Sequence, residues 1–103
     1  MKKTMLLGVL LLLGTFALFA QNRPTITVTN NTGAYIFYLY ISESTSDDWE
    51  EDVLGDEVLA PGRSYNIRLP NNGIWDFMAV DEDDNEYTLM GIDVPAISRI
   101  SIR

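Results

Sequence analysis

The stretch from Ala34 to Ile41 constrains the fold more than any other part of the sequence. Most of its eight residues are aromatic or β-branched, and none is Gly, Pro or charged. With the two-residue period of a strand, one face carries Tyr35, Phe37, Leu39 and Ile41, and the other face is also apolar or aromatic. A strand that is apolar on both faces is typical of the middle of a sheet. We therefore expect a central strand here.

Short alternating segments, separated by turn residues, fill the rest of the chain. They cover residues 24–29, 58–62, 64–69, 74–80, 87–90 and 96–102. In the segment 74–80, Trp75, Phe77 and Ala79 share one face. Six or seven short strands about ten residues apart, with no segment of helical period, are typical of all-β domains. The sequence therefore predicts a small antiparallel β-sandwich.

Two of the turns predict how neighbouring strands are joined. The pair Asn72-Gly73 is favoured in two-residue hairpins, so we expect the strands on either side of it to pair. The turn at 30–33 predicts a hairpin or a tight corner between the first two strands.

Residues 1–20 have the layout of a secretory signal peptide. Lys2 and Lys3 precede an apolar run that ends at Ala20, and a polar segment follows. The run is shorter than the about 20 residues that a membrane span needs, although an uncleaved anchor is the alternative interpretation. We expect cleavage after Ala20, a single domain over 21–103, and a periplasmic or secreted location.

Charge and composition exclude several classes of function. Removing residues 1–20 leaves 83 residues with five arginines and fifteen carboxylates, a formal charge of −10. This charge argues against nucleic acid and against anionic membranes as partners, and favours cations, basic proteins or simply solubility. The chain has no His and no Cys, so the commonest general base and the thiolate nucleophile are absent. We expect a monomer that is not an enzyme.

Two acidic segments are candidates for a calcium site. Asp81, Asp83 and Asn85 have the 1, 3, 5 spacing of the oxygen ligands in an EF-hand loop. Glu86 stands where that loop has Gly, and Ile92 where it has a bidentate Glu, so further ligands have to come from elsewhere. Three candidates lie in the first acidic segment: Asp47, Asp48 and Asp52. A domain stabilised by Ca²⁺ is therefore one hypothesis, and a pair of solvated acidic turns without cofactor is the other.

Trp49 and Asp76 are the remaining candidates. Trp49 either packs with Leu54 on the edge of the sandwich or stays exposed and binds a partner. Asp76 lies within an apolar strand, and we expect it to pair with an arginine, Arg63 or Arg68. Paired carboxylates also admit a small hydrolase as a third interpretation.

The chain resembles a family of short exported bacterial domains of uncharacterised function. The resemblance covers nearly the whole chain after residue 20. It is carried by Asn31-x-Gly33, Leu39-Tyr40-Ile41-Ser42, Asp47-Asp48-Trp49, Leu59-x-Pro61-Gly62 and Asp81-x-Asp83. It implies a β-sandwich outside the cytoplasm and no particular activity. We therefore expect an interaction module that binds an unknown protein or glycan partner through Trp49 and the acidic loops.

Overall fold

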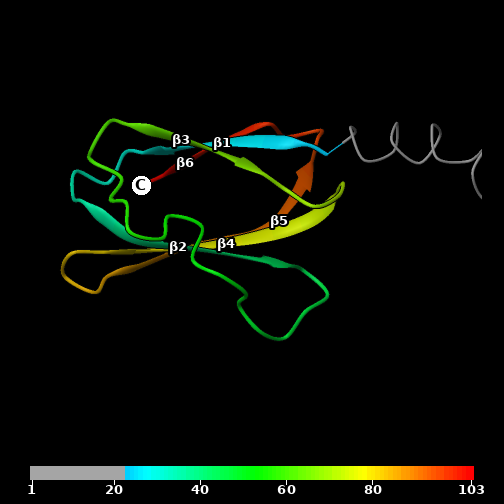
Figure 1. Cartoon of the computed structure of the whole chain (residues 1–103), viewed down its shortest axis with the longest axis horizontal. Coiled ribbons are helices and arrows are strands. Elements are labelled where there is room, and N and C mark those ends of the chain that lie inside the picture. Colours follow the sequence, from blue (N-terminus) through cyan, green and yellow to red (C-terminus); the bar gives the residue numbers. More distant parts are fainter. Residues whose placement is uncertain (1–22) are drawn as a thin grey trace, which may run out of the picture.

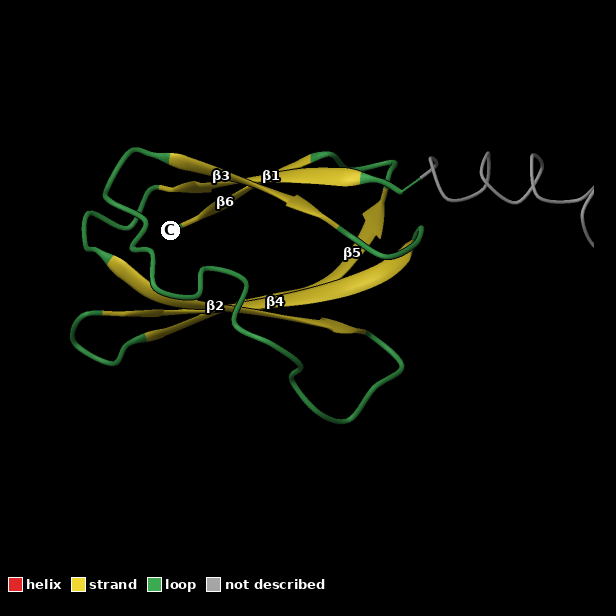
Figure 2. Ribbon diagram, viewed as in Figure 1, coloured by secondary structure: helices red, strands yellow, loops and turns green. Residues whose placement is uncertain are grey.

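The computed structural model describes residues 23–103. Within this range, six strands form two three-stranded sheets that face each other (Figures 1 and 2). The strands are β1 (Thr25–Asn30), β2 (Ile36–Glu43), β3 (Ser64–Arg68), β4 (Gly73–Asp81), β5 (Glu86–Val94) and β6 (Arg99–Ile102). The all-β prediction is confirmed. The predicted signal peptide lies outside the described residues, and no helix able to cross a bilayer occurs within them.

The first sheet has the strand order β3-β1-β6, and the second sheet has the order β2-β4-β5. All pairs are antiparallel except β1 and β6, which run parallel, with Thr27 opposite Arg99. This pair departs from the antiparallel prediction. The reason is that β6 enters the first sheet from β5 in the second, so no hairpin sets its direction relative to β1.

Most connections in the described chain pass from one sheet to the other, and the turn between β4 and β5 is the hairpin. The two-residue hairpin predicted at Asn72-Gly73 is wrong, because β3 and β4 belong to different sheets. Leu69 and Trp75, on either side of this connection, are both buried in the core. The chain therefore crosses the sandwich here, and the Trp75 indole N–H donates to the carbonyl of Asn71 at 3.2 Å.

The space between the sheets is filled by one apolar cluster. Strand β4 contributes Trp75, Phe77 and Ala79, each 1% exposed, as their spacing predicts. The other buried members are Ile26, Val28, Ile36, Leu39, Ile41, Leu54, Leu59, Ile67, Leu69, Val94, Ile100 and Ile102. Burying a large apolar side chain contributes about 1.5–3 kcal/mol, so this cluster supplies most of the driving force for folding.

Strand β2 is an edge strand, and the prediction of a central strand is wrong for it. Its register shifts at a bulge between Ile36 and Tyr38, which interrupts the expected alternation. Phe37 is therefore exposed, at 41%, although Leu39 two residues later is buried; Tyr38, on the outer face, is 45% exposed. The central strand of the second sheet is β4.

The segment 50–59 covers the free edge of β2. The backbone N–H of Glu50 donates to Ile41, that of Val53 donates to Leu39, and Leu59 exchanges two hydrogen bonds with Ile36. The Asp52 carboxylate accepts from the Leu39 N–H at 2.9 Å and from the Leu54 N–H at 3.1 Å. Covering an edge in this way prevents it from pairing with another chain.

Asn30 ties three parts of the chain together inside the core. Its amide nitrogen donates to the carbonyls of Ala34 at 2.7 Å and Leu59 at 2.9 Å. Its amide oxygen accepts from the backbone and the hydroxyl of Thr32. The side chain is 0% exposed, so this full set of partners offsets the cost of burying an amide.

Candidate functional site

The outer surface of the second sheet carries a row of exposed and half-buried aromatic, aliphatic and thioether side chains. Strand register places Tyr38 opposite Val80, and Tyr40 opposite Met78. The rings of Tyr38 and Tyr40 stack with their centroids 6.0 Å apart and their planes 11° from parallel. We call the surface made by Tyr38, Tyr40, Met78, Val80 and Met90 the tyrosine–methionine face. Met90 is 63% exposed, so a partner that docks here removes a large apolar area from water.

Trp49 lies at the end of the tyrosine–methionine face. It is half-buried and lines a hollow of about 100 Å³ together with Ser42, Asp76 and Met90. Leu54 and Trp49 do not pack together at the sandwich edge as one of the two interpretations expected: Leu54 packs into the core, and Trp49 rests on the outer surface of the second sheet. Ligand pockets usually measure about 300–1,000 Å³, so this hollow fits a side chain of a partner better than a free small molecule.

Asp76 fixes the segment that carries Trp49. Its Oδ1 accepts from the hydroxyl of Ser44 and from the backbone N–H of Gly91 at 2.9 Å. The Ser44 N–H donates to the carbonyl of Ile74 at 2.9 Å, so this serine is bound to β4 twice. The prediction that Asp76 pairs with an arginine is wrong. Both proposed arginines belong to the first sheet, on the opposite side of the core.

The acidic turn between β4 and β5 is organised by Asp81. This side chain is 2% exposed. Its Oδ1 accepts from the backbone N–H groups of Asp83 and Asn85, both at 2.9 Å. Its Oδ2 accepts from the Asn85 amide at 3.1 Å and from the Tyr87 hydroxyl at 2.9 Å. Asp81 is therefore occupied in shaping the turn.

The same hydrogen bonds set the protonation state of Asp81. Burial alone raises the pKa of this carboxyl, but the bonds from Asn85, Tyr87 and Asp83 outweigh burial, and the pKa lies below its ordinary value. The pKa of Tyr87 is raised, first because its hydroxyl donates to Asp81, and second because it is buried. Asp81 thus remains a carboxylate down to acidic pH.

The structure does not bring the two acidic segments together. Ile36 pairs with Asp81 at one end of β2, and Glu43 pairs with Trp75 at the other. The turn that holds Asp83 and Asn85 therefore lies at the opposite end of the second sheet from the loop that follows β2 (Figure 1). Asp47 and Asp48 are exposed in that loop, and Asp52 caps the edge of β2. Within residues 23–103 there is no group of three acidic side chains placed to hold a metal ion.

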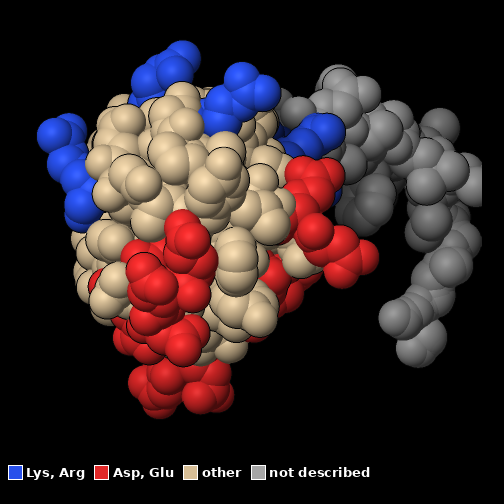
Figure 3. Space-filling view, turned by 90° about the vertical axis from the view of Figure 1, so that its left-hand side faces the viewer, with Lys and Arg blue, Asp and Glu red and all other residues tan. Residues whose placement is uncertain are grey.

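The charges of the described chain are completely divided between the two sheets. All fifteen carboxylates lie in the second sheet or in the segments 31–62 and 70–95 that adjoin it, where there is no Lys or Arg. All five arginines lie in the segments 23–30, 63–69 and 96–103, which form the first sheet and contain no Asp or Glu. Figure 3 shows this division as a basic upper part and an acidic lower part.

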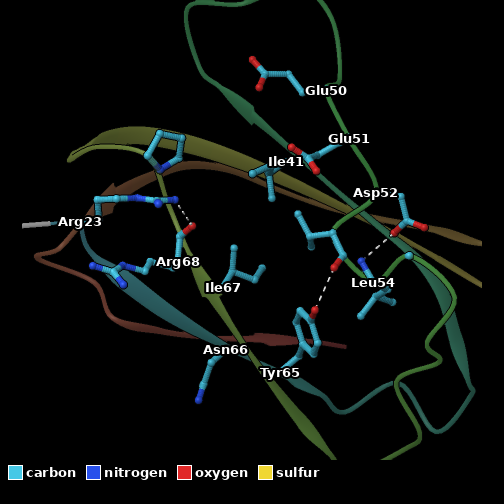
Figure 4. A pocket seen from close by; sticks show the side chains of 13 residues that line it. Arg23, Ile41, Glu50, Glu51, Asp52, Leu54, Tyr65, Asn66, Ile67 and Arg68 are labelled. Atoms are coloured by element: carbon cyan, nitrogen blue, oxygen red, sulfur yellow. Dashed lines mark hydrogen bonds between the residues drawn. The ribbon is translucent and has the colours of Figure 1, made fainter. Parts of the chain in front are cut away.

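A groove of about 430 Å³ opens where the two charge territories meet (Figure 4). Arg23 and Arg68 lie on one side of it, and Glu50 and Glu51 on the other. Arg23 donates to the carbonyls of Leu69 at 3.0 Å and Arg68 at 3.1 Å. The Tyr65 hydroxyl across the groove likewise donates to a backbone carbonyl. The Arg23 and Tyr65 side chains therefore already make hydrogen bonds within the protein and are not free to bind a ligand. The groove is for this reason a weaker candidate than the tyrosine–methionine face.

No protein-family model, no curated protein and no solved structure matches the chain. The resemblance to a family of short exported domains therefore stays a prediction. The candidate site depends on the geometry alone.

Sequence reasoning identified Trp49 but missed the surface beside it. The aromatic residues of β2 were assigned to a buried strand, because aromatic side chains at strand spacing are usually core. The bulge after Ile36 was not visible in the sequence. The separation of arginines from carboxylates can be read from the sequence when charges are counted segment by segment. The net charge of the whole chain does not reveal it.

Proposed function

We propose that this protein is an exported binding module that docks a basic protein on the tyrosine–methionine face. The observation that carries the proposal is the combination of an aromatic and thioether surface, on which Tyr38 and Met90 are exposed, with carboxylates beyond both of its ends. Tyr, Trp and Met are enriched in the centres of protein interfaces, and charged residues form their rims.

The stacked tyrosines suit this role because their rings are already ordered. Stacking at 6.0 Å restricts both side chains before a partner arrives, which lowers the entropy lost on binding. Trp49 is similarly held, because Asp76 and Ser44 anchor its segment to β4. A partner therefore meets a largely preformed surface.

The acidic segments favour a partner with Lys and Arg at its rim. The 82–84 turn and the loop after β2 place exposed carboxylates beyond the two ends of the face. Complementary charge accelerates encounter and excludes acidic competitors more than it adds affinity. Met78, Val80 and Met90 surround the tyrosines with aliphatic and thioether groups, which favours a protein surface over a glycan.

Site-specific photo-crosslinking tests the proposal in the exporting cell. A photoreactive residue at Tyr38 samples the tyrosine–methionine face, and one at Thr27 samples the outer surface of the first sheet. The proposal predicts a crosslinked protein with a basic surface from Tyr38, at a yield well above that from Thr27. Crosslinking from Thr27 alone, or no crosslinked protein from either position, would contradict it.

Binding of the purified partner then defines the surface. Tyr38→Ser together with Met90→Ser should weaken binding by about tenfold or more, because central interface residues often contribute more than 1 kcal/mol each. Ile97→Ser is the matched control, since Ile97 is also exposed, at 40%, but lies in the turn between β5 and β6. A sugar that binds the unaltered protein and competes with the partner would replace the protein assignment with a glycan.

A further inference from the structure

The outer surface of the first sheet is as distinctive as that of the second, and its chemistry is the opposite. Strand alternation turns Ile26, Val28, Ile67 and Ile100 into the core. The outward positions therefore hold only hydroxyl, amide and guanidinium side chains. They are Thr25, Thr27, Thr29, Ser64, Asn66, Arg68, Arg99 and Ser101.

Four arginines frame this surface. Arg63 and Arg68 stand at the two ends of β3, and Arg99 and Arg103 stand at the two ends of β6, with β1 between these strands. Strands lie about 4.8 Å apart and rise about 3.3 Å per residue. The frame is therefore about 10 Å across and about 13–17 Å along the strands. All four side chains are exposed.

The floor between the arginines is a ladder of hydroxyl and amide groups. The Thr27 hydroxyl donates to the Asn66 amide oxygen at 2.8 Å, and the hydroxyls of Thr29 and Ser64 share a hydrogen bond of 2.8 Å. These bonds connect β1 to β3 across the surface and hold the side chains in fixed positions. We call the floor and its frame the arginine–hydroxyl face.

We propose that the arginine–hydroxyl face binds an anionic polysaccharide. A guanidinium group matches the geometry of a carboxylate or sulfate with two parallel hydrogen bonds. Fixed hydroxyl and amide groups between the arginines can exchange hydrogen bonds with the hydroxyls of the sugar rings. The net charge of the chain argues against an anionic partner, but this surface contains no Asp or Glu side chain.

The same side chains disfavour the other polyanions. Binding single-stranded nucleic acid without sequence preference uses aromatic side chains on which bases stack, and the outward strand positions of this face have none. Insertion into an anionic bilayer uses apolar or aromatic side chains beside the basic ones, and these are absent from the same positions. Hydroxyl groups between arginines are the chemistry of a sugar site.

Charge segregation gives the interaction an unusual dependence on salt. At about 10 mM salt the Debye length is about 30 Å, so the carboxylates of the second sheet also act on the polysaccharide. The net negative charge of the molecule then repels it. At about 150 mM the Debye length is about 8 Å, shorter than the about 10 Å between packed sheets, and the arginines act alone. At about 1 M even these contacts are screened. Binding should therefore be strongest at intermediate salt.

The test uses the purified protein, produced by export from the full-length chain. Its retention is measured on dextran sulfate, on polygalacturonate and on uncharged dextran at the three salt concentrations. The proposal predicts retention on one or both anionic polymers that peaks near about 150 mM salt, and none on dextran. The two anionic polymers distinguish sulfate from carboxylate as the preferred group.

Variants locate the contact. Arg68→Gln combined with Arg99→Gln should weaken binding by about 2- to 25-fold, because an exposed ion pair contributes about 1.4- to 5-fold and the free energies of distant sites add. Arg23→Gln removes a charge outside the face and should have a smaller effect. Tyr38→Ser lies on the other sheet and should leave retention unchanged, so this test is independent of the proposed protein partner. Denaturant unfolding of each variant shows that the fold is intact.

Three results would overturn the proposal. One is equal retention on dextran and dextran sulfate at about 150 mM salt. Another is unchanged binding by the double arginine variant. The last is equal affinity for single-stranded DNA or for phosphatidylglycerol vesicles, which would reduce the face to a general anion-binding surface.

Discussion

Replacing Asn30 by aspartate should destabilise the protein severely, although the two side chains have the same shape. The carboxylate can still accept from Thr32, but it cannot donate to the carbonyls of Ala34 and Leu59, which lie 2.7 and 2.9 Å away. The Leu59 carbonyl still accepts from the Ile36 N–H, and the Ala34 carbonyl still accepts from the Thr32 hydroxyl. Losing the two bonds from Asn30 costs about 0.5–1.5 kcal/mol each, about 1–3 kcal/mol together, and burying a carboxylate against two carbonyl oxygens adds to this cost. A domain of this size has about 5–15 kcal/mol of stability in total.

Urea unfolding measures this loss. Trp75 is 1% exposed in the folded protein, so its fluorescence reports loss of the core. Asn31→Asp is the matched control, because it makes the same chemical change at the exposed neighbouring position and should alter stability by less than about 0.5 kcal/mol. The deficit of Asn30→Asp should shrink as pH falls towards about 4, because burial beside two carbonyl oxygens raises the pKa of the new carboxyl above its ordinary value of about 3.9, and the protonated carboxyl can donate one bond. A loss below about 1 kcal/mol for Asn30→Asp would refute the assignment of Asn30 as a tie between the sheets and the segment that covers β2.

Three further predictions concern the acidic segments. Because the folded pKa of Asp81 is lowered, its contribution to stability is present above the unfolded pKa of about 3.9 and is lost as pH falls through the folded value. The melting temperatures of the unaltered protein and of Asp81→Asn should therefore converge at low pH; a constant difference down to pH values near 2 would contradict this assignment. Calcium at millimolar concentration should leave the melting temperature equal to that in EDTA, since the two acidic segments lie at opposite ends of the second sheet; a rise that magnesium does not reproduce would restore the calcium hypothesis. Ser44→Ala should release the segment of Trp49, which a lower fluorescence anisotropy in a Trp75→Phe background would detect; unchanged anisotropy would show that the bond to Asp76 does not hold it.

The sequence predicted most reliably those elements whose two sides face different surroundings. Trp75, Phe77 and Ala79 were assigned to one buried face because β4 alternates between core and outer surface. The Asn72-Gly73 hairpin failed for a different reason. The turn residues favour pairing of the two flanking strands. Leu69 and Trp75, however, are both buried between the sheets, and the chain passes from the first sheet to the second between them.

The candidate surfaces were harder to predict than the fold. Tyr38 and Tyr40 have the residue types of a core strand, and they alternate with the buried Leu39 and Ile41. Their accessibility follows from the two-layer fold, which packs only one face of the second sheet against the first. The partners of Asp76 could not be predicted from its charge alone. An aspartate among apolar residues suggests an arginine partner, but a serine hydroxyl and a backbone N–H bind it instead.

Under the two proposals, the two sheets present separate binding surfaces of opposite charge. Backbone amide chemical shifts of the labelled protein test it directly, with poly-lysine and dextran sulfate added separately at about 150 mM salt, where the Debye length is about 8 Å. We expect poly-lysine to shift the amides of β2, β4, β5 and their acidic turns, and dextran sulfate to shift those of β1, β3 and β6. Shifts of the same residues by both polymers, or dextran sulfate shifts confined to the second sheet, would contradict it.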